Sequence, residues 1–218
     1  HAALEEAKKA KELYEKNDED SYFGAATTAI EMFEFSNEIL KDMEDDDIET
    51  AIDVLKNATI IANNEQDASK LLLGSTFSDK YTNSVPAGWI IENSNVNEDG
   101  DPIGFYANNG VFSAKAQLYG TFDMKQTITC LPEGTYKISA LCATTTDDGS
   151  ARAAVYAMAG NNKARTQEVT KLWDSVNKEV EEYQCYVKVN GNQDLVVGIT
   201  TDNHNVYVKQ INIQYVQD

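Results

Sequence analysis

Proline, cysteine and histidine are scarce in this chain of 218 residues, which contains 3 Pro, 3 Cys and 2 His. His1 is terminal and His204 lies in a predicted turn, and neither stands beside a nucleophile motif. The G-x-S-x-G, P-loop and dinucleotide-binding motifs are also missing. No spacing singles out one pair of carboxylates for acid–base work. We therefore expect no enzyme activity and no cofactor.

Positive charge is in short supply as well. The chain has 18 Lys and Arg against 36 Asp and Glu, which gives a formal net charge of −18. Nucleic acids and anionic lipids are bound through clusters of Lys and Arg, and the sequence has no such cluster. No apolar run approaches the roughly 20 residues that a membrane-spanning helix needs. These absences predict no nucleic acid partner and no transmembrane segment.

Glycine and proline are distributed unevenly, and this divides the chain. Residues 1–70 contain no Pro and one Gly, and they carry 7 Lys and no Arg against 19 Asp and Glu. All three Pro and eleven of the twelve Gly follow. We predict an α+β multidomain chain, with a three-helix antiparallel bundle at residues 1–66 and an all-β jelly-roll sandwich at residues 70–218. Residues 64–67 are the expected linker.

Three amphipathic helices are predicted in the first part, at residues 2–16, 21–43 and 47–63, and short connections favour an antiparallel bundle. Asp46 and Glu49 form a capping-box pattern at the start of the third helix. The apolar stripe expected on this third helix consists of Ile48, Ala51, Ile52, Leu55, Ala58, Thr59 and Ala62.

Residues 118–143 carry the clearest strand pattern of the chain. Apolar residues alternate with polar ones in two runs, which places one set of side chains on one face of a sheet. Pro132 and Gly134 favour a tight turn between the runs. We predict a β-hairpin here. The expected inward-facing residues are Phe122, Met124, Ile128 and Cys130 in the first strand, and Tyr136, Ile138, Ala140 and Cys142 in the second.

The predicted hairpin sets the expectation for the cysteines. It would place Cys130 opposite Thr135 and Cys142 approximately opposite Asp123, too far apart for the roughly 7 Å between Cα atoms that a disulfide allows. Cys185 also lies in an apolar-alternating run, where a free cysteine behaves as a small hydrophobe. We therefore expect three core thiols.

Strand patterns continue to the end of the chain, at residues 151–159, 179–189, 194–201 and 206–216. Trp89 stands at the start of an earlier strand, and we expect its side chain to lie in the core rather than to bind a ligand. About eight strands separated by frequent turns are typical of a β-sandwich or jelly roll. In the last strand, the alternation places Tyr207, Lys209, Ile211, Ile213 and Tyr215 on one face.

Residues 160–177 are ambiguous between two structures. Apolar residues at 169, 172, 173, 176 and 180 have helical spacing, which favours a helix. The alternative is a long loop that leads into the strand at residues 179–189.

Residues 124–139, MKQTITCLPEGTYKIS, resemble the Q-x-[IVL]-x-x-L-P-x-G-x-Y-x-[LIV] signature of galactose-binding-domain-like β-sandwiches. These domains resemble carbohydrate-binding modules and occur in secreted bacterial glycan-utilisation proteins. Phe77, Gly88-Trp89, Trp173 and residues 196–199 fit in order, so the resemblance covers about residues 71–217. It implies a loop at residues 160–177 and an extracytoplasmic protein, either secreted or on the cell surface. The helical part resembles FIVAR-like three-helix spacer modules.

The resemblance also bears on calcium. Many sandwiches of this kind hold a structural calcium with a Glu after the opening Phe and an Asp in a late D-N-F segment. Here Ser78 follows Phe77, and the late segment is Lys-Gln-Ile at residues 209–211. We therefore expect this metal site to be missing.

A second calcium candidate lies at residues 95–101, NVNEDGD. It approximates the loop pattern D-x-[DN]-x-[DN]-G, in which alternate oxygens surround one ion. Asn95 replaces the first carboxylate, however, and Tyr106 stands where a bidentate Glu would close the loop. The alternative is a polar hairpin loop with an Asp99-Gly100 turn.

A sugar site combines an exposed aromatic plane with polar side chains. Loops at one end of a sandwich, or a sheet face, are the expected places for it. Trp173 could instead have a packing role, with its ring filling the space beneath its long loop. The candidate planes are Trp173, Tyr106 and Tyr81, and the candidate polar partners are Asn108, Asn109, Arg152, Arg165 and Asp147.

Three functions remain open at this point. The first is non-catalytic binding of an oligosaccharide or polysaccharide, with the helices as a spacer. The second is a structural or protein–protein interaction module without sugar binding. A large apolar patch shared by helices and sandwich would favour this second function. The third, a hydrolase fragment, needs two facing carboxylates in a cleft. The chain begins at His1 without Met, so we expect a processed or truncated product with any signal peptide upstream.

Overall fold

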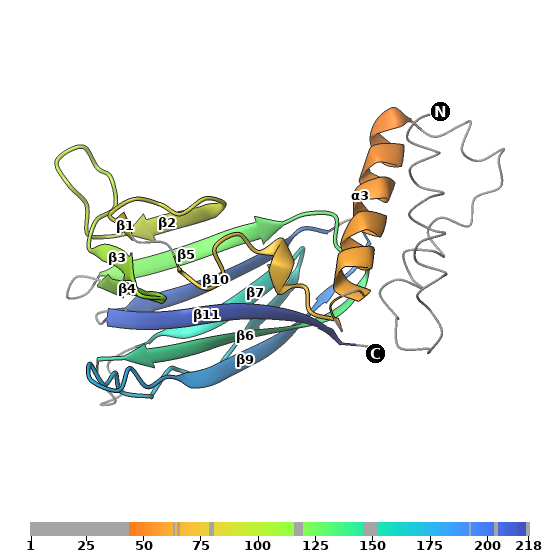
Figure 1. Ribbon diagram of the computed structural model, residues 1–218. Coiled ribbons are helices and arrows are strands. Elements are labelled where there is room, and N and C mark those ends of the chain that lie inside the picture. Colours follow the sequence, from red (N-terminus) through yellow and green to blue (C-terminus); the bar gives the residue numbers. More distant parts are fainter. Residues whose placement is uncertain are drawn as a thin grey trace.

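The computed structural model describes residues 44–62, 64, 66–78, 81–115, 120–145, 152–191, 193–202 and 205–216. This part of the chain folds into a β-sandwich of two antiparallel sheets with one α-helix at its end (Figure 1). Sheet A has six strands in the order β1-β3-β4-β11-β6-β9, and sheet B has five in the order β2-β5-β10-β7-β8. The predicted all-β sandwich is confirmed.

The strands of each sheet have the following bounds. Sheet A consists of β1 (Tyr81–Thr82), β3 (Phe105–Asn108), β4 (Val111–Lys115), β6 (Gly134–Thr144), β9 (Glu181–Val189) and β11 (Asn205–Val216). Sheet B consists of β2 (Trp89–Asn93), β5 (Thr121–Ile128), β7 (Ala154–Ala159), β8 (Asn162–Arg165) and β10 (Leu195–Asp202).

The last strands lie where the sequence predicts them, although β8 was not expected. Residues 166–180 form an irregular connection between β8 and β9, with a turn at residues 175–177. The helical spacing of its apolar residues is therefore misleading, and the loop implied by the family resemblance is confirmed.

An aromatic cluster fills one end of the core between the two sheets. Phe112 lies at its centre, with ring centroids 5.3 Å from Phe77, 5.8 Å from Phe122 and 6.3 Å from Phe105. Trp89 joins the cluster, is almost fully buried, and donates from Nε1 to the Leu73 carbonyl at 2.6 Å. The prediction that Trp89 is a core residue is confirmed.

The predicted hairpin at residues 118–143 is wrong. β5 lies in sheet B and β6 lies in sheet A, so residues 129–133 cross from one sheet to the other instead of turning within one. Met124 and Ile138 are both fully buried, but they enter the core from opposite sheets and are not neighbours on one ladder. Alternation reports which side of a strand faces the core, and it does not report which strand is the neighbour.

The expectation for the cysteines changes with this correction. The separation of Cys130 and Cys142 was inferred from a ladder that does not exist. The structure has three free cysteines: Cys142 and Cys185 are buried core thiols as predicted, whereas Cys130 is only half-buried. Cys130 follows the end of β5 and has a left-handed backbone with φ of 55°.

The expected alternation in the last strand is also wrong in part. The register between β11 and β6 shifts between Val208 and Gln210, which marks a β-bulge. One extra residue reverses the phase of alternation. Tyr207 therefore points away from the core, while Ile211 and Ile213 point into it and are fully buried.

The helix α3 (Asp45–Ala62) confirms the third predicted helix. Ile52, Leu55 and Ala58 of the predicted stripe are buried, and Val54 and Ile61 are buried as well, although they were not predicted. The predicted helices at residues 2–16 and 21–43 lie outside the described residues. The described part of the chain contains no helix that is both long and apolar enough to cross a membrane.

The end of α3 is joined to the sandwich by polar contacts. Asn57 donates from Nδ2 to the carbonyls of Thr129 and Cys130 at 3.2 and 3.0 Å, which ties the helix to the β5–β6 crossing. Ile61 belongs to the sandwich core. After the helix, the chain runs along β11 and then forms the 3-10 helix η2 (Ser69–Leu71). The division into two domains stays a prediction.

The burial of the thiols predicts their reactivity. Burial raises the pKa of the Cys185 thiol to about 11 and that of Cys142 well above its ordinary value, so both remain protonated at pH 8. We expect a disulfide-exchange reagent to modify only the half-buried Cys130 rapidly in the native protein, and all three thiols in denaturant. Rapid reaction of two or three thiols in the folded chain would contradict this burial.

Gly134 is the first residue of β6, and a substitution there tests how tightly β6 packs against Tyr215 of β11. It has φ of 150°, and a Cβ there would lie 2.3 Å from the Tyr215 ring. We expect Gly134→Ala to lower the free energy of unfolding by about 3 kcal/mol. Gly191 has φ of 53° but open space around it, so Gly191→Ala should cost only about 1 kcal/mol. Urea denaturation of the full chain measures both, and equal costs would show that the contact with Tyr215 is unimportant.

Candidate functional site

The outer face of sheet A, which points away from the core, carries an aromatic stack. The strand registers place Tyr106, Ser113, Tyr207 and Ala143 in one row across β3, β4, β11 and β6. Ser113 and Ala143 are small, and they leave room beside Tyr207 for a ring from another segment. The ring of Trp173 occupies this position and stacks on Tyr207, with centroids 4.4 Å apart and planes 5° from parallel.

The loop that carries Trp173 is held to the sheet by backbone contacts. The Trp173 N–H donates to the Thr144 carbonyl at 2.8 Å, and the Thr144 N–H donates to the Lys171 carbonyl at 2.8 Å. The hydroxyl of Tyr183 accepts the N–H groups of Thr170 and Lys171. Trp173 is therefore fixed on the sheet as well as half-exposed at its surface.

Asp174 shapes the turn that follows Trp173. Its Oδ1 accepts the backbone N–H groups of Val176 and Asn177 at 2.7 and 3.1 Å, and these bonds lower the pKa of the carboxyl. The carboxylate is therefore ionised over the neutral range. These bonds close the turn at residues 174–177.

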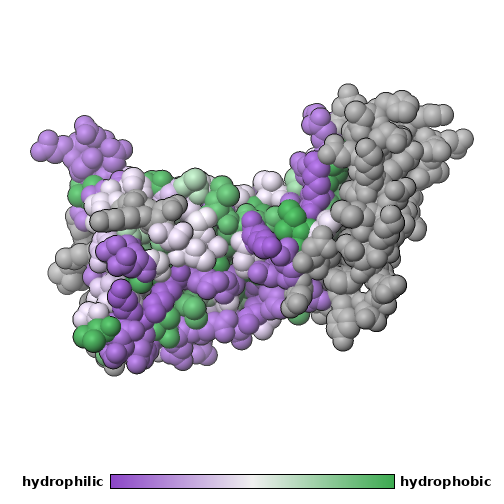
Figure 2. Space-filling model, in the orientation of Figure 1, coloured by the Kyte–Doolittle hydropathy of each residue, from purple (hydrophilic) through white to green (hydrophobic). Residues whose placement is uncertain are grey.

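Beyond the stack, polar side chains cover the same face. Figure 2, in the orientation of Figure 1, shows hydrophilic side chains gathered over β11, β6 and β9. Gln210 donates from Nε2 to Oδ1 of Asn212 at 2.6 Å, which orients the Asn212 amide. Two of the outward-facing rows beyond the bulge are Asn212–Ser139–Gln184 and Gln214–Lys137–Tyr186.

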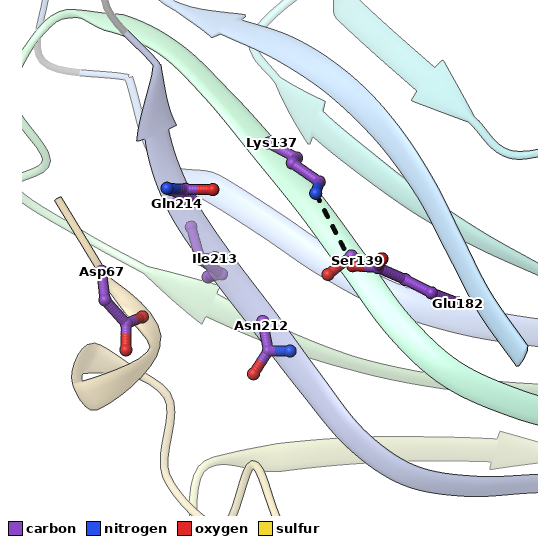
Figure 3. A pocket seen from close by; sticks show the side chains of 7 residues that line it. All are labelled: Asp67, Lys137, Ser139, Glu182, Asn212, Ile213 and Gln214. Atoms are coloured by element: carbon purple, nitrogen blue, oxygen red, sulfur yellow. Dashed lines mark ion pairs between the residues drawn. The ribbon is translucent and has the colours of Figure 1, made fainter. Parts of the chain in front are cut away.

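These rows border a hollow of about 340 Å³ at the end of β11 nearest η2. In Figure 3, the amide nitrogen of Asn212 and the carboxamide oxygen of Gln214 are turned toward β6. Lys137 and Glu182 form an ion pair at 3.6 Å on the far side, and both side chains remain partly exposed. The complete lining is Asp67, Lys137, Ser139, Glu182, Asn212, Ile213 and Gln214.

Asp67 forms the wall of the hollow opposite β6. It lies between α3 and η2, is bridged to Gln214 of β11, and accepts the Ser69 N–H at 2.8 Å. The hollow therefore exists only because the segment after the helix runs along the sheet. Its groups are carboxylate, carboxamide, hydroxyl and ammonium, which can donate to and accept from hydroxyl groups of a ligand.

Three of the eight predicted site residues lie on this face. Trp173 is in the stack, and Tyr106 is 46 % exposed in the same row, two strands or about 10 Å away from Tyr207. Asn108 is exposed two residues along β3. Asn109, with φ of 53°, forms the two-residue turn to β4 with Gly110.

The predicted arginines lie at the other sheet. Arg165 is on β8 at the edge of sheet B, where it donates to Glu168 at 3.0 Å and to the Arg152 carbonyl at 3.2 Å. The backbone of Tyr81 pairs with Ala107, and its side chain is not described. Asp147 lies outside the described residues.

The polar residues of the hollow were not predicted from the sequence. Asn212 and Gln214 alternate with buried isoleucine and tyrosine in β11, and this alternation was a usable signal for an outward polar row. Lys137 and Ser139 alternate in the same way in β6. Asp67 gives no such signal, because it reaches the site through long-range pairing.

Residues 95–101 form a small hairpin loop. Val96 and Pro102 are bridged, and Oδ1 of Asn97 accepts the N–H groups of Asp99 and Asp101 at 3.0 and 2.8 Å. The alternative of a polar hairpin loop therefore describes this segment. Among the described residues, no three His, Cys, Asp or Glu side chains are grouped so that they could hold a metal ion.

No protein-family model and no curated protein matches this chain. Among solved structures, the chain is similar to the module TmCBM61 in complex with β-1,4-galactotriose, with 11 % identity, a TM-score of 0.40, and coverage of 65 % of this chain and 92 % of that one. It is similar to a module named CBM4 with 14 % identity, a TM-score of 0.43, and coverage of 66 % and 98 %. A mutant of the family 29 carbohydrate-binding module CBM29-2 gives 9 % identity, a TM-score of 0.36, and coverage of 64 % and 90 %.

The stack on Tyr207 can be tested through Trp173. We expect Tyr207→Ala to expose the Trp173 ring, to shift tryptophan emission to longer wavelength, and to lower the free energy of unfolding by about 2 kcal/mol. Tyr207→Phe keeps the ring and is the matched control, with a change within about 0.5 kcal/mol. The other tryptophan, Trp89, is buried in the core away from this stack and should give a constant background. Unchanged emission in Tyr207→Ala would show that Trp173 is held by its loop alone.

Proposed function

We propose that this protein binds a neutral oligosaccharide or polysaccharide, without cleaving it, on the outer face of sheet A. The observation that carries this proposal is the combination on one face of the Trp173–Tyr207 stack with the polar hollow. The two features lie seven residues apart along β11, which corresponds to about 20 Å in a strand. A glycan chain of several rings can follow this path.

The chemistry of a sugar matches both ends of the face. A pyranose ring has an apolar C–H face that packs on aromatic rings, and Trp173 is partly exposed for such a contact. The hydroxyl groups of the next rings need donors and acceptors together. Asn212, Gln214 and Ser139 supply both, and Lys137 supplies a donor.

The charge of the chain favours a neutral glycan. The formal net charge is −18, and the hollow sets Asp67 and Glu182 against a single Lys137. A polysaccharide with carboxylate or sulfate groups is repelled by this distribution, and desolvation at the surface adds to the cost. Neutral hydroxyl groups meet no such penalty.

The segment that precedes the sandwich takes part in the proposed site. Asp67 lines the hollow, so a fragment that starts after it lacks one wall. The segment after α3 therefore completes the site, while the helical part serves as a spacer in a secreted or cell-surface protein. This dependence makes the full chain the material of choice for binding experiments.

A protein-interaction module is less well supported by the surface. Such a module was expected to show a large apolar patch shared by helices and sandwich. Within the described residues, no exposed large apolar side chain lies on α3. Those on the sandwich are spread over different segments, namely Leu73, Val85, Ile90, Val96, Tyr106, Leu172, Val176 and Tyr186.

A glycan array with the full chain tests the proposal, each neutral glycan being printed beside an acidic counterpart. We expect binding to neutral glycans, and calorimetry with the best of them should show about a tenfold loss of affinity in Trp173→Ala. The double variant Asn212→Ala, Gln214→Ala should show a comparable loss, because two hydrogen-bonding amides are removed.

Asn161, an exposed turn residue away from this face, offers a matched control. Asn161→Ala should bind as the unchanged protein does. Absence of binding to every printed glycan would reject the proposed function. Affinity that is unchanged by all the substitutions on sheet A would place the site elsewhere.

A further inference from the structure

The outer face of sheet B carries an aromatic plane that the proposed site does not use. Tyr156 of β7 pairs with Gly198 of β10, and a Cβ at Gly198 would lie 2.4 Å from Cζ of the tyrosine ring. The ring therefore lies flat across β10, in space that any other residue at 198 would fill. One face of the ring covers the strand, and the opposite face is turned away from the sheet.

The ring is held in this position from a third strand. The Tyr156 hydroxyl donates to Oδ2 of Asp123 on β5 at 3.0 Å, so the side chain spans β7, β10 and β5. Lys125 lies 3.6 Å from the same carboxylate and 2.8 Å from Glu92 of β2. This chain of contacts fixes the ring and arranges one ammonium and two carboxylates along its rim.

The protonation states suit a binding surface. Burial raises the pKa of Tyr156 far above its ordinary value, and the nearby Asp123 adds to this shift, so the hydroxyl stays a donor. Burial also raises the pKa of Asp123, while the bond from Tyr156 and the charge of Lys125 act against the rise. Both neighbours therefore favour the ionised form of Asp123, in which its oxygens are acceptors.

Apolar and polar groups surround the ring in register. The row across sheet B is Ile90, Lys125, Gly198, Tyr156 and Arg165. Ile90 is 53 % exposed at one end of this row. In the neighbouring row, Val196 and Met158 are half-buried beside the ring. The result is a flat plate with an apolar centre and a charged rim.

We propose that the plate of Tyr156 is a second glycan-binding surface, which stacks the apolar face of a pyranose ring while Asp123, Lys125 and Glu92 bond to its hydroxyls. An aromatic ring that only shields a glycine would serve the fold equally well without a charged rim. The rim supplies the acceptors and the donor that sugar hydroxyls require. The proposal extends the proposed function to the opposite face, and it does not depend on the site of sheet A.

Two sites on opposite faces give the protein a property that one site lacks. The plate and the hollow lie on different sheets of the sandwich, so both can be occupied at once. A single molecule would then bridge two glycan chains, or hold one branched chain with increased effective affinity.

The test starts from the sheet A variant Trp173→Ala, Asn212→Ala, Gln214→Ala of the full chain. On an array of neutral oligosaccharides that includes β-1,4-galactotriose and mannohexaose, we expect this variant to retain binding to at least one glycan. Adding Tyr156→Leu, which still covers Gly198 but removes the aromatic plane, should lower the remaining affinity about tenfold. Tyr156→Phe keeps the plane and should bind within about threefold, since it loses only the bond to Asp123.

Thermal melts of all variants show whether each is folded, and Lys125→Met gives a rim variant that leaves the ring in place. Loss of all binding in the sheet A variant would overturn the second site. An affinity that stays unchanged when Tyr156→Leu and Lys125→Met are both added would overturn it as well. The two proposals separate cleanly. If Tyr156→Leu alone abolishes every interaction of the otherwise unchanged protein, the plate is the binding site and the sheet A site is rejected.

Discussion

The backbone of β11 needs partners on both of its sides, and this requirement organises the molecule. β6 accompanies it on one side along almost its whole length, but β4 pairs only with residues 205–208. Farther along, the Ile211 N–H donates to the Ser75 carbonyl, the Ala68 N–H donates to the Ile213 carbonyl, and the Tyr215 N–H donates to the Gln66 carbonyl. The segment after α3 therefore closes a strand edge that would otherwise be open to unspecific pairing. The hollow on sheet A is a consequence, since its outer wall is this same segment.

The bulge in β11 decides what the outer face can bind. Before the bulge, Tyr207 points outward and meets Trp173, whereas after it the outward positions belong to Asn212 and Gln214. Without the extra residue, the isoleucines that now fill the core would be directed to solvent and the amides would be buried. A single insertion in the ladder thus keeps the core apolar and places aromatic and polar chemistry at opposite ends of one strand. The proposed glycan ligand, which has apolar ring faces and hydroxyl groups, would use both ends of this strand.

The sequence predicts these features unequally, and the reason is the range over which each is determined. Alternation is local, so the strands near residues 181–189, 195–202 and 205–216 and the burial of Met124 and Ile138 follow from it. The neighbour of a strand is a property of the whole fold, which is why β5 and β6 resemble a hairpin in sequence and lie in different sheets. The stack on Tyr207 and the hollow join residues more than thirty positions apart, and local patterns contain no information about such contacts. The sequence identifies Trp173, Tyr106 and Asn108 as candidate ligand-binding side chains, but it does not show that all three lie on one face of the sandwich.

The two outer faces differ because of what lies over each sheet. On sheet A, the segment of Asp67 pairs with the edge of β11 and forms one wall of the hollow, so the surface is recessed there. On sheet B, Gly198 has no side chain, so the Tyr156 ring packs directly on the backbone of β10. A recessed path surrounds a flexible chain and can compensate for the entropy lost on ordering it, because each ring makes contacts on several sides. A flat plate contacts only one face of one ring, and its affinity depends on the few charged groups at the rim. Occupation of both would therefore combine a selective site with a weaker one, and the linked pair would gain most on glycans that present many chains close together.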